Sequence, residues 1–367
     1  MSLQPTLPKH MYVDAEQFAV ERDRILFASW FCVGRLGELG LDRPGRLAVL
    51  DVVGESILIT VDGEGVLHGA YNVCRHRGSQ IVPVDGELPP SCDVASLRCP
   101  YHSWTYDLSG RLLKAPHSES VGDFDASDFS IAPVGVASWG GFCFVNLTPE
   151  SATDFDSDIA PFADRLQRYP LARLTRGLSF TYDVRANYKV LAENYNECYH
   201  CGPVHPELTR LVPSFGSGGD DLDWDDGIPH RQGAWTFTTT GTTNRRPFPD
   251  LNGAERTRHK GELIYPNLWL SCAADHVASF ISWPLAVDRT RVQCDLLFET
   301  DAIEAADFGP RDAGDLWDLV NNQDWAICES VQRGMSSRAY RQGWFAPMED
   351  SSADIRRWLL PLLGGDS

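Results

Sequence analysis

The chain has 367 residues, which is long for a single hydrophobic core, so two domains are expected. Apolar residues make up 43% of it, with 11 tryptophans and 17 phenylalanines, and this composition excludes wholesale disorder. The 51 acidic and 32 basic side chains give a net charge of −19, which opposes binding to nucleic acid and to anionic lipid head groups. An acidic face that docks a basic electron donor is compatible with this charge.

The N-terminal segment MSLQPTLPKHMYVDAEQF has no apolar core flanked by positive charge. No apolar run in the sequence reaches the roughly 18 residues that a membrane span needs. A cytoplasmic chain that does not bind membranes is therefore expected. In that reducing compartment the 10 cysteines should not form a disulfide framework, so cysteines near histidines are first considered as metal ligands.

The first predicted element is an amphipathic helix over residues 15–30, where apolar side chains recur near helical spacing among charged ones. Apolar runs separated by glycine-containing turns follow, which indicates consecutive hairpins. Residues 31–150 are therefore expected to form a small β domain. Its predicted strands and hairpins lie at 46–53, 56–62, 66–73, 103–114 and 141–147.

The acidic and polar segment 148–158 predicts the boundary to a second, larger domain, residues 151–367. Its predicted helices and strands lie at 158–169, 178–185, 187–199, 264–271, 277–284, 290–299 and 312–337. Residues 213–262 are rich in Gly, Asp, Thr and Pro, so an irregular loop region is expected there. The fold class is therefore α+β: a small all-β domain, and a larger domain with a central antiparallel sheet flanked by helices, on which the N-terminal helix of residues 1–30 packs.

Two short motifs at predicted hairpin ends each offer one thiolate and one imidazole: Cys74 with His76, and Cys99 with His102. Two cysteines on one iron and two histidines on the other can hold a [2Fe–2S] cluster. A structural zinc site is the competing interpretation, because two Cys and two His also suit tetrahedral Zn²⁺. The alternation of Cys and His at the ends of β-strands favours the cluster.

A second group of candidate ligands begins with His200 and His205, which lie five residues apart across the end of a predicted helix. Gly202-Pro203 is expected to break that helix, so that the two imidazoles can meet. Two imidazoles and one carboxylate on one face of Fe(II) leave positions open for O₂ and substrate. A carboxylate from elsewhere in the chain is therefore sought.

Asp324 is the predicted third ligand. In the helix predicted at 312–337 it falls on an apolar stripe, which is expected to be buried: Leu316, Val320, Ile327 and Val331. A carboxylate on such a face is unfavourable unless it is paired or binds a cation. A buried Asp that caps a backbone group or pairs with an arginine is the alternative.

The runs CRHRGSQ and CPYHSWTYDLSGRL resemble the cluster-binding motifs of the Rieske domain of ring-hydroxylating and related oxygenases. The spacing His200-x₄-His205 and the segment DWAICESVQRG are similar to the mononuclear iron motifs of the same family. The resemblance covers residues 20–345, and it implies a Rieske non-haem iron oxygenase α subunit with catalytic domain 151–367. The family's ligands correspond to Cys74, His76, Cys99 and His102 for the cluster, and to His200, His205 and Asp324 for Fe(II). A longer stretch between the cluster motifs, including 88–92, departs from the family pattern and is expected to be a surface loop.

Glu197 stands where many family members have an aspartate that links the two metal sites across a subunit interface. The resemblance thus implies a bond to a cluster histidine of a neighbouring subunit, such as its His102, and a homotrimer or a multiple of three chains. A carboxylate that only ends the helix is the alternative. Asn194 is a weaker candidate for lining the iron pocket, with a structural role as its alternative.

The resemblance further implies that O₂ is the co-substrate and that electrons come from NAD(P)H through a separate reductase or ferredoxin. No Gly-rich dinucleotide motif is present in this sequence. The run NECYHC is similar to the branch that hydroxylates or N-demethylates betaine-, choline- and carnitine-like quaternary amines. An aromatic cage for such a cation could draw on Trp235, Phe237, Tyr265, Trp269, Phe280 and Trp283.

Two further functions stay open at this point. One is hydroxylation of an aromatic ring or aromatic acid, which needs an apolar slot of similar size. The other, from a different class, is an electron carrier that holds the Rieske cluster without a mononuclear iron. Cys198 and Cys201 have the spacing of a redox dithiol, but a proposed iron ligand lies between them, so they are expected to be bystanders.

Overall fold

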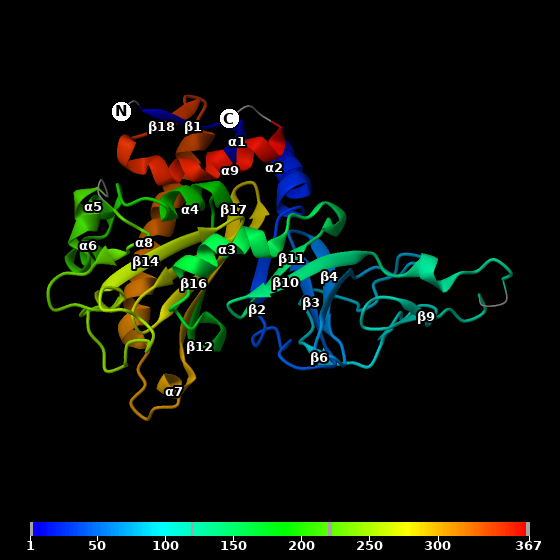
Figure 1. The fold of residues 1–367 in the computed structure, drawn as a ribbon. Coiled ribbons are helices and arrows are strands. Elements are labelled where there is room, and N and C mark those ends of the chain that lie inside the picture. The colour runs from blue at the N-terminus through cyan, green and yellow to red at the C-terminus, as the bar shows by residue number, and fades with distance from the viewer. Residues whose placement is uncertain (1–2, 119–120, 219–221, 365–367) are drawn as a thin grey trace. The chain divides into compact units, whose positions relative to one another are not determined.

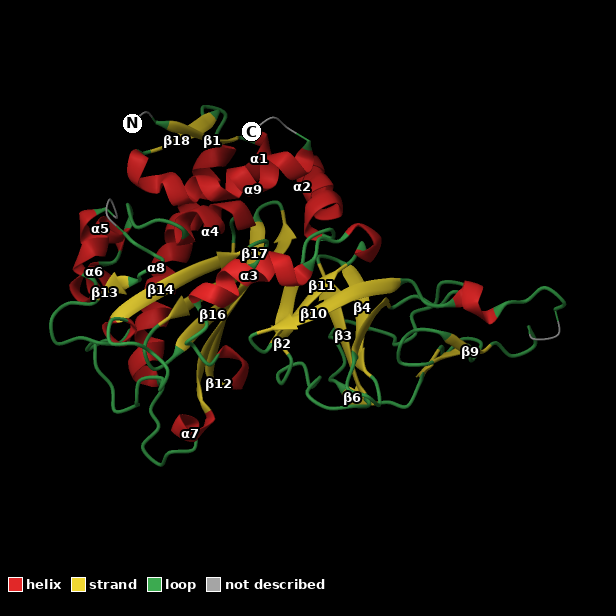
Figure 2. Ribbon diagram, in the orientation of Figure 1, coloured by secondary structure: helices red, strands yellow, loops and turns green. Residues whose placement is uncertain are grey.

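The computed structural model describes residues 3–118, 121–218 and 222–364 (Figure 1). The chain divides into two compact units. Leu26–Asp158 form the β unit, and Met1–Ile25 with Ile159–Ser367 form the α+β unit. The unit boundaries thus fall after Ile25 and after Asp158, whereas the sequence suggests boundaries after residues 30 and 150. The combination of an all-β unit with a unit of helices and antiparallel sheet confirms the α+β fold class (Figure 2).

The β unit contains a seven-stranded antiparallel sheet in the order β2-β11-β10-β5-β4-β3-β6. Its strands are β2 (Phe31–Arg35), β3 (Arg46–Val52), β4 (Glu55–Val61), β5 (Leu67–Tyr71), β6 (Cys92–Asp93), β10 (Pro133–Trp139) and β11 (Phe142–Asn146). Strands β3 and β4 form a hairpin whose two turn residues, Val53 and Gly54, have φ angles of 51° and 94°. Positive φ at both positions is what a tight two-residue hairpin turn requires.

A smaller three-stranded sheet, β7 (Leu97–Arg98), β8 (Thr105–Tyr106) and β9 (Leu112–Lys114), belongs to the same unit. Its side chains share a hydrophobic core with the large sheet. This core joins Leu47, Leu58 and Ala70 to Leu97, Trp104 and Tyr106, and it includes Cys74 and Cys99. Burial of apolar surface therefore fixes the two motif-bearing loops on one core.

The α+β unit is built on a six-stranded antiparallel sheet in the order β12-β17-β16-β15-β14-β13. Its strands are β12 (Leu174–Val184), β13 (Ile228–Pro229), β14 (Arg258–Ile264), β15 (Leu268–Cys272), β16 (Val277–Ala286) and β17 (Arg289–Glu299). A separate pair, β1 (Gln4–Pro8) and β18 (Gln342–Phe345), joins the two ends of the described chain. All residues of β15 are buried, as expected for a central strand covered on both faces.

The helices are α1 (His10–Val13), α2 (Ala15–Glu21), α3 (Phe155–Arg165), α4 (Tyr188–Tyr195), α5 (Cys201–Val204), α6 (Pro206–Leu211), α7 (Thr300–Ile303), α8 (Arg311–Ser336) and α9 (Asp354–Leu363). The longest, α8, packs against α4 and against β12. Helix α4 begins at a cap in which the Asn187 side chain accepts a hydrogen bond from the backbone N–H of Lys189. In the described parts of the chain, no helix combines the length and apolar character needed to cross a membrane.

Three element predictions need correction. The helix predicted at 15–30 ends earlier, because α2 continues only as a π-helical turn, Arg22–Leu26. The helix predicted at 187–199 ends at Tyr195, so the residues from 196 to 200 lie outside it. The strand predicted at 264–271 is two strands, because β14 ends at Ile264 and β15 begins at Leu268, and β14 starts inside the region predicted as loop.

The buried stripe predicted for the long helix is also partly wrong. Leu316 and Val320 are buried, but Ile327 and Val331 are each 38% exposed. The buried face instead continues through Trp325, Cys328 and Gln332. Asp324 borders this face and is partly buried. The prediction of Asp324 as the third ligand therefore rests on an apolar stripe of which only the N-terminal half is buried.

Candidate active site

The β unit brings together the loop that carries Cys74 and His76 and the loop that carries Cys99 and His102. Cys74 follows strand β5, and Cys99 and His102 lie in the loop that joins β7 to β8. The ring centroids of His76 and His102 are 4.6 Å apart, and His76 stacks on Trp104 at 5.0 Å. Both cysteines are buried and free, and Cys99 lies close enough to Cys74 to contribute to the raised pKa of its thiol, after the larger effect of burial. All four predicted ligands therefore meet at one place.

These residues fit an iron–sulfur cluster. The Nδ1 atom of His102 is buried and has no hydrogen-bond partner among the described residues, as expected of a nitrogen reserved for a metal. The Tyr106 hydroxyl lies 3.2 Å from Cys74 Sγ. Hydrogen bonds to ligand sulfurs are one means by which proteins tune the reduction potential of such clusters. The intervening segment 87–90 is largely exposed, and Cys92 belongs to the edge strand β6.

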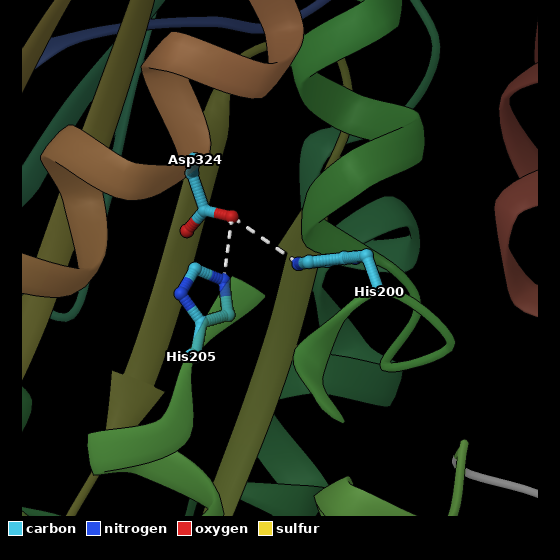
Figure 3. Close-up of side chains that lie close together, drawn as sticks. All are labelled: His200, His205 and Asp324. Atoms are coloured by element: carbon cyan, nitrogen blue, oxygen red, sulfur yellow. Dashed lines mark hydrogen bonds and ion pairs between the residues drawn. The ribbon is translucent and has the colours of Figure 1, made fainter. Parts of the chain in front are cut away.

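The α+β unit brings His200, His205 and Asp324 together (Figure 3). One ligand atom from each lies within 4.8 Å of the other two. Asp324 Oδ1 is 2.9 Å from His205 Nε2 and 3.2 Å from His200 Nε2. Asp324 comes from α8, His200 from the segment after α4, and His205 from the junction between α5 and α6. The convergence of these three donors fits a 2-His-1-carboxylate iron site.

The chain turns out of the short helix α5 at His205, not at Gly202-Pro203 as predicted. Gly202 and Pro203 are part of α5, whereas His205 has φ −121° and ψ 68°. Proline at the next position, Pro206, disfavours helical dihedral angles in the residue before it. This change of direction allows the His205 side chain to approach that of His200.

The partners of both histidines select the tautomer that a metal needs. The Nδ1–H of His200 donates to Glu197 Oε1 at 2.5 Å, and the Nδ1–H of His205 donates to Gln323 Oε1 at 2.8 Å. Each ring therefore turns Nε2 toward Asp324, and in the neutral tautomer this nitrogen carries the lone pair that can bind a metal. The contact of Gln323 with His205 was not predicted from the sequence. The position of Gln323 next to the predicted ligand Asp324 is the one sequence feature that points to it.

The electrostatics of the three residues favour a cation between them. Burial would lower the pKa of His200, but hydrogen bonds with Asp324 and Glu197 raise it to about 11. Burial would raise the pKa of Asp324, but its contacts with His200 and His205 hold it below its ordinary value. A proton on the imidazole thus occupies the place where a metal ion could supply the positive charge instead.

The other two predicted residues lie beside this group. Asn194 Nδ2 is 3.3 Å from His200 Nε2. Glu197 contacts His200 through Oε1, while its Oε2 accepts the backbone N–H groups of Tyr199 and His200. Within this chain Glu197 therefore orients a candidate iron ligand, and its predicted bond to a neighbouring subunit's cluster stays a prediction.

A cavity of about 700 Å³ adjoins Asn194, His200, His205 and Asp324. Four of the six aromatic residues proposed for a cage line it: Phe237, Tyr265, Trp269 and Phe280. Trp235 and Trp283 are not among its described lining residues, and Trp283 instead lies under the guanidinium of Arg291 at 5.3 Å. Sequence reasoning missed Trp224, Trp317 and Trp325, which also line the cavity.

Cys198 and Cys201 are free, buried thiols that lie close together. The hydrogen bond with Cys198, followed by burial, raises the pKa of Cys201. A thiol with a raised pKa is a poor nucleophile and redox group. This environment disfavours thiolate chemistry at Cys201, and the bystander role expected for the pair stays a prediction.

Residues 29–125 match the family described as "Rieske [2Fe-2S] domain", and residues 171–365 match "Ring hydroxylating alpha subunit (catalytic domain)". The glycine betaine monooxygenase oxygenase subunit of Pseudomonas aeruginosa is 30% identical over 92% of this chain and 84% of its own length. The carnitine monooxygenase oxygenase subunit of Acinetobacter baumannii is 29% identical over 92% and 86%. The crystal structure of the quaternary ammonium Rieske monooxygenase CntA with L-carnitine superimposes with a TM-score of 0.72 at 27% identity, covering 98% of this chain and 96% of that one.

These matches agree with the two candidate metal sites. A Rieske domain carries a [2Fe–2S] cluster, and the catalytic domain of this family binds a mononuclear iron that uses O₂. The zinc interpretation of the Cys and His motifs is thereby set aside. The chain belongs to the family of Rieske non-haem iron oxygenases, as an α subunit with both a Rieske domain and a ring-hydroxylating-type catalytic domain.

Proposed function

We propose that this oxygenase hydroxylates an N-methyl group of a small quaternary amine, so that the product releases formaldehyde and leaves a tertiary amine. The observation that carries the proposal is the lining of the cavity beside His200, His205 and Asp324. Its walls are rich in aromatic side chains, whose faces attract an ammonium group. The relatives named for glycine betaine and carnitine support the same substrate class.

The charge of the cavity lining also favours a cationic substrate. The described lining contains five carboxylates and two guanidiniums: Glu197, Asp225, Glu262, Asp324, Asp354, Arg165 and Arg357. The formal charge of these groups is −3, and a ferrous ion at the triad leaves −1. A negative lining attracts an ammonium ion and opposes an aromatic acid, which makes aromatic-acid hydroxylation the weaker alternative.

Each part of the site has a role in this reaction. We propose that Cys74, His76, Cys99 and His102 hold the cluster, and that His200, His205 and Asp324 hold the iron. When bound, the two metal groups supply electrons and activate O₂. Glu197 and Gln323 keep the protons of His200 and His205 on Nδ1. The aromatic walls exclude water and hold the N-methyl group near the triad.

We further propose that electrons reach the cluster from NAD(P)H through a separate reductase or ferredoxin, and that the chain works as a homotrimer. The net charge of −19 suits a basic electron donor. The position of Glu197 beside His200 suits a carboxylate that also contacts a neighbouring subunit's cluster. Light scattering on the purified protein should give a mass of about three chains, and NADH consumption should require added reductase.

The deciding experiment is formaldehyde release by the iron-loaded enzyme with a reductase, O₂ and a panel of N-methylated amines and aromatic acids. We expect formaldehyde from at least one N-methylated cation, in proportion to the NADH consumed. Coupled turnover with an aromatic acid alone would overturn the proposal. An electron carrier, the remaining alternative, would bind about two irons per chain where the proposed enzyme binds about three.

A further inference from the structure

We infer that the substrate carries its N-methylated ammonium group on an apolar body and has no carboxylate. The inference rests on the proposed function and narrows its substrate class. Glycine betaine and carnitine, which appear in the names of the relatives, both carry a carboxylate. A carboxylate inside a protein cavity needs a cationic or hydrogen-bonding partner. Trp269 Nε1 and Trp325 Nε1 line the cavity and have no hydrogen-bond partner among the described residues, but neutral donors bind a carboxylate less strongly than a guanidinium does. The cationic groups of this cavity are therefore the decisive residues.

Arg165 is one of the two arginines among the described lining residues, and Glu262 already occupies its guanidinium. Arg165 Nε is 2.6 Å from Glu262 Oε1, and its Nη2 is 2.7 Å from Oε2. This is the bidentate geometry in which an arginine binds a carboxylate most strongly. Asp225 adds a second acidic group at 3.7 Å. Arg165 is thus held by two acidic side chains from the protein itself.

Arg357, the other arginine of the described lining, is half-exposed and is also paired, in its case with two different aspartates. Its Nη2 is 2.6 Å from Asp350 Oδ1, and its Nη1 is 2.6 Å from Asp354 Oδ1. The Nη1 group also donates to the backbone carbonyl of Asp350 at 3.0 Å. No lysine belongs to the described lining. A substrate carboxylate would therefore find each of these cations already paired.

Displacement of Glu262 by a substrate carboxylate is unfavourable. The Glu262 side chain is only 8% exposed, so without Arg165 it would be left as a buried, unpaired charge. The incoming carboxylate would also enter a lining that is negative even with iron bound. A substrate with an ammonium group and no carboxylate avoids both penalties.

The interior walls of the cavity suit an apolar body. Phe237, Trp269, Phe280 and Trp317 line it, and all four are buried. Phe237 stacks on Trp317 at 4.5 Å, and Phe280 meets Trp317 edge-on at 5.6 Å. The volume of about 700 Å³ lies among pockets that take drug-sized ligands, about 300–1,000 Å³. The cavity thus offers apolar contact surface beyond what a trimethylammonium head needs.

Binding to the purified, iron-loaded wild-type protein tests both parts of the inference, with calorimetry and tryptophan fluorescence as readouts. Choline and glycine betaine are similar in size and differ in the carboxylate, so choline should bind at least tenfold more tightly. The phenethyltrimethylammonium ion differs from choline by its apolar body, and it should bind at least tenfold more tightly than choline. Formaldehyde release should follow the same order.

A matched pair of variants tests the role of Arg165. Glu262→Gln frees the guanidinium, so the affinity ratio of glycine betaine to choline should rise about tenfold. The double variant Arg165→Met, Glu262→Gln should lose that gain, because the freed cation is gone. Asp183→Asn is the control, since it breaks the equally bidentate pair with Arg289, whose residues do not line the cavity. That control should leave the ratio unchanged.

The outcomes separate this inference from the proposed function. Equal or tighter binding of glycine betaine or carnitine, relative to choline, overturns the inference but leaves N-demethylation intact. Equal affinity for choline and phenethyltrimethylammonium overturns the inference that the substrate has an apolar body. If no N-methylated cation binds or yields formaldehyde, the proposed function fails and the inference with it. If Glu262→Gln does not fold, as judged by circular dichroism, the wild-type series alone decides.

Discussion

The indole Nε1–H of Trp317 donates a hydrogen bond to Nε2 of His276 at a distance of 3.1 Å. The other ring nitrogen of His276 lies 3.0 Å from Oδ1 of Asp275, and the second oxygen of Asp275 pairs with Arg245 at 2.7 Å. All four groups are buried. A chain of hydrogen bonds that begins at Arg245 therefore fixes the orientation of a tryptophan in the cavity wall.

Replacement of His276 should weaken both the fold and the cavity. His276→Leu leaves the Trp317 N–H and one oxygen of Asp275 buried without this partner, which is expected to cost about 1–3 kcal/mol of unfolding free energy. Because Trp317 loses its anchor, KM for an N-methylated substrate should rise more than kcat falls. Denaturant unfolding and steady-state kinetics measure the two effects. His276→Gln, which can still donate and accept, should lose less, and equal losses in the two variants would contradict the explanation.

Glu197 should act through His200, without contacting the substrate's reacting carbon. Glu197→Gln keeps the shape of the side chain but removes the charge that holds the His200 Nδ1 proton at 2.5 Å. Loss of such a partner typically lowers metal affinity or activity about 10–100-fold. Iron titration, followed by activity at saturating iron, separates these two losses. Glu197→Asp keeps the carboxylate and should retain more activity than Glu197→Gln; the reverse order would refute a role that depends on charge.

The two metal sites should be separable by mutation, because their ligands lie in different units of the chain. His205→Ala should lower iron from about three to about two per chain and leave the visible spectrum of the cluster unchanged. Cys99→Ala should remove the cluster and its colour. Iron and sulfide quantitation with visible spectroscopy measures both. Loss of colour in His205→Ala, or a full cluster in Cys99→Ala, would show that the ligands are wrongly assigned.

The candidate ligands that the sequence predicts most directly are pairs that lie close together along the chain. Cys74 with His76, Cys99 with His102, and His200 with His205 each lie within five residues of each other, so their spacing is readable. Asp324 lies 119 residues after His205 and was chosen because an acidic residue on an apolar helix face needs a partner. Asp324 lies beside His200 and His205 although Ile327 and Val331 are exposed, because Val320 and Trp325 still place it at the edge of the buried face. Its role as an iron ligand stays a prediction.

The cavity wall could not be predicted in the same way. Its aromatic residues come from segments as distant as Phe162 in α3, Trp224 in a loop and Trp358 in α9. An aromatic residue on a strand or helix has the same local pattern whether it faces a core or a cavity. Trp235 and Trp283 illustrate this, because their sequence surroundings resembled those of Phe237 and Phe280. Only tertiary packing distinguishes the two pairs.

The free energy of unfolding should depend on pH through the ionisation of Glu193. Its Oε1 accepts a 2.5 Å hydrogen bond from the Tyr12 hydroxyl. Burial raises the pKa of the Glu193 carboxyl to about 8. A group whose pKa is higher in the folded than in the unfolded state stabilises the fold fully below its unfolded pKa, and this contribution is lost as the pH rises through the folded value. The loss should therefore occur between about pH 4.5 and pH 8, and should be on the order of a few kcal/mol.

Glu193→Gln removes this titration, so its unfolding free energy should change less than that of the wild type between pH 5 and about pH 8. Denaturant unfolding at several pH values measures the difference. The Tyr12 hydrogen bond lowers the pKa of Glu193, against the larger effect of burial. Tyr12→Phe should therefore shift the loss of stability to higher pH, because the ionised carboxylate loses a donor. If the unfolding free energies of the wild type, Glu193→Gln and Tyr12→Phe all change with pH in the same way, the pKa of Glu193 is the same in the folded and unfolded chain. That result would contradict the prediction.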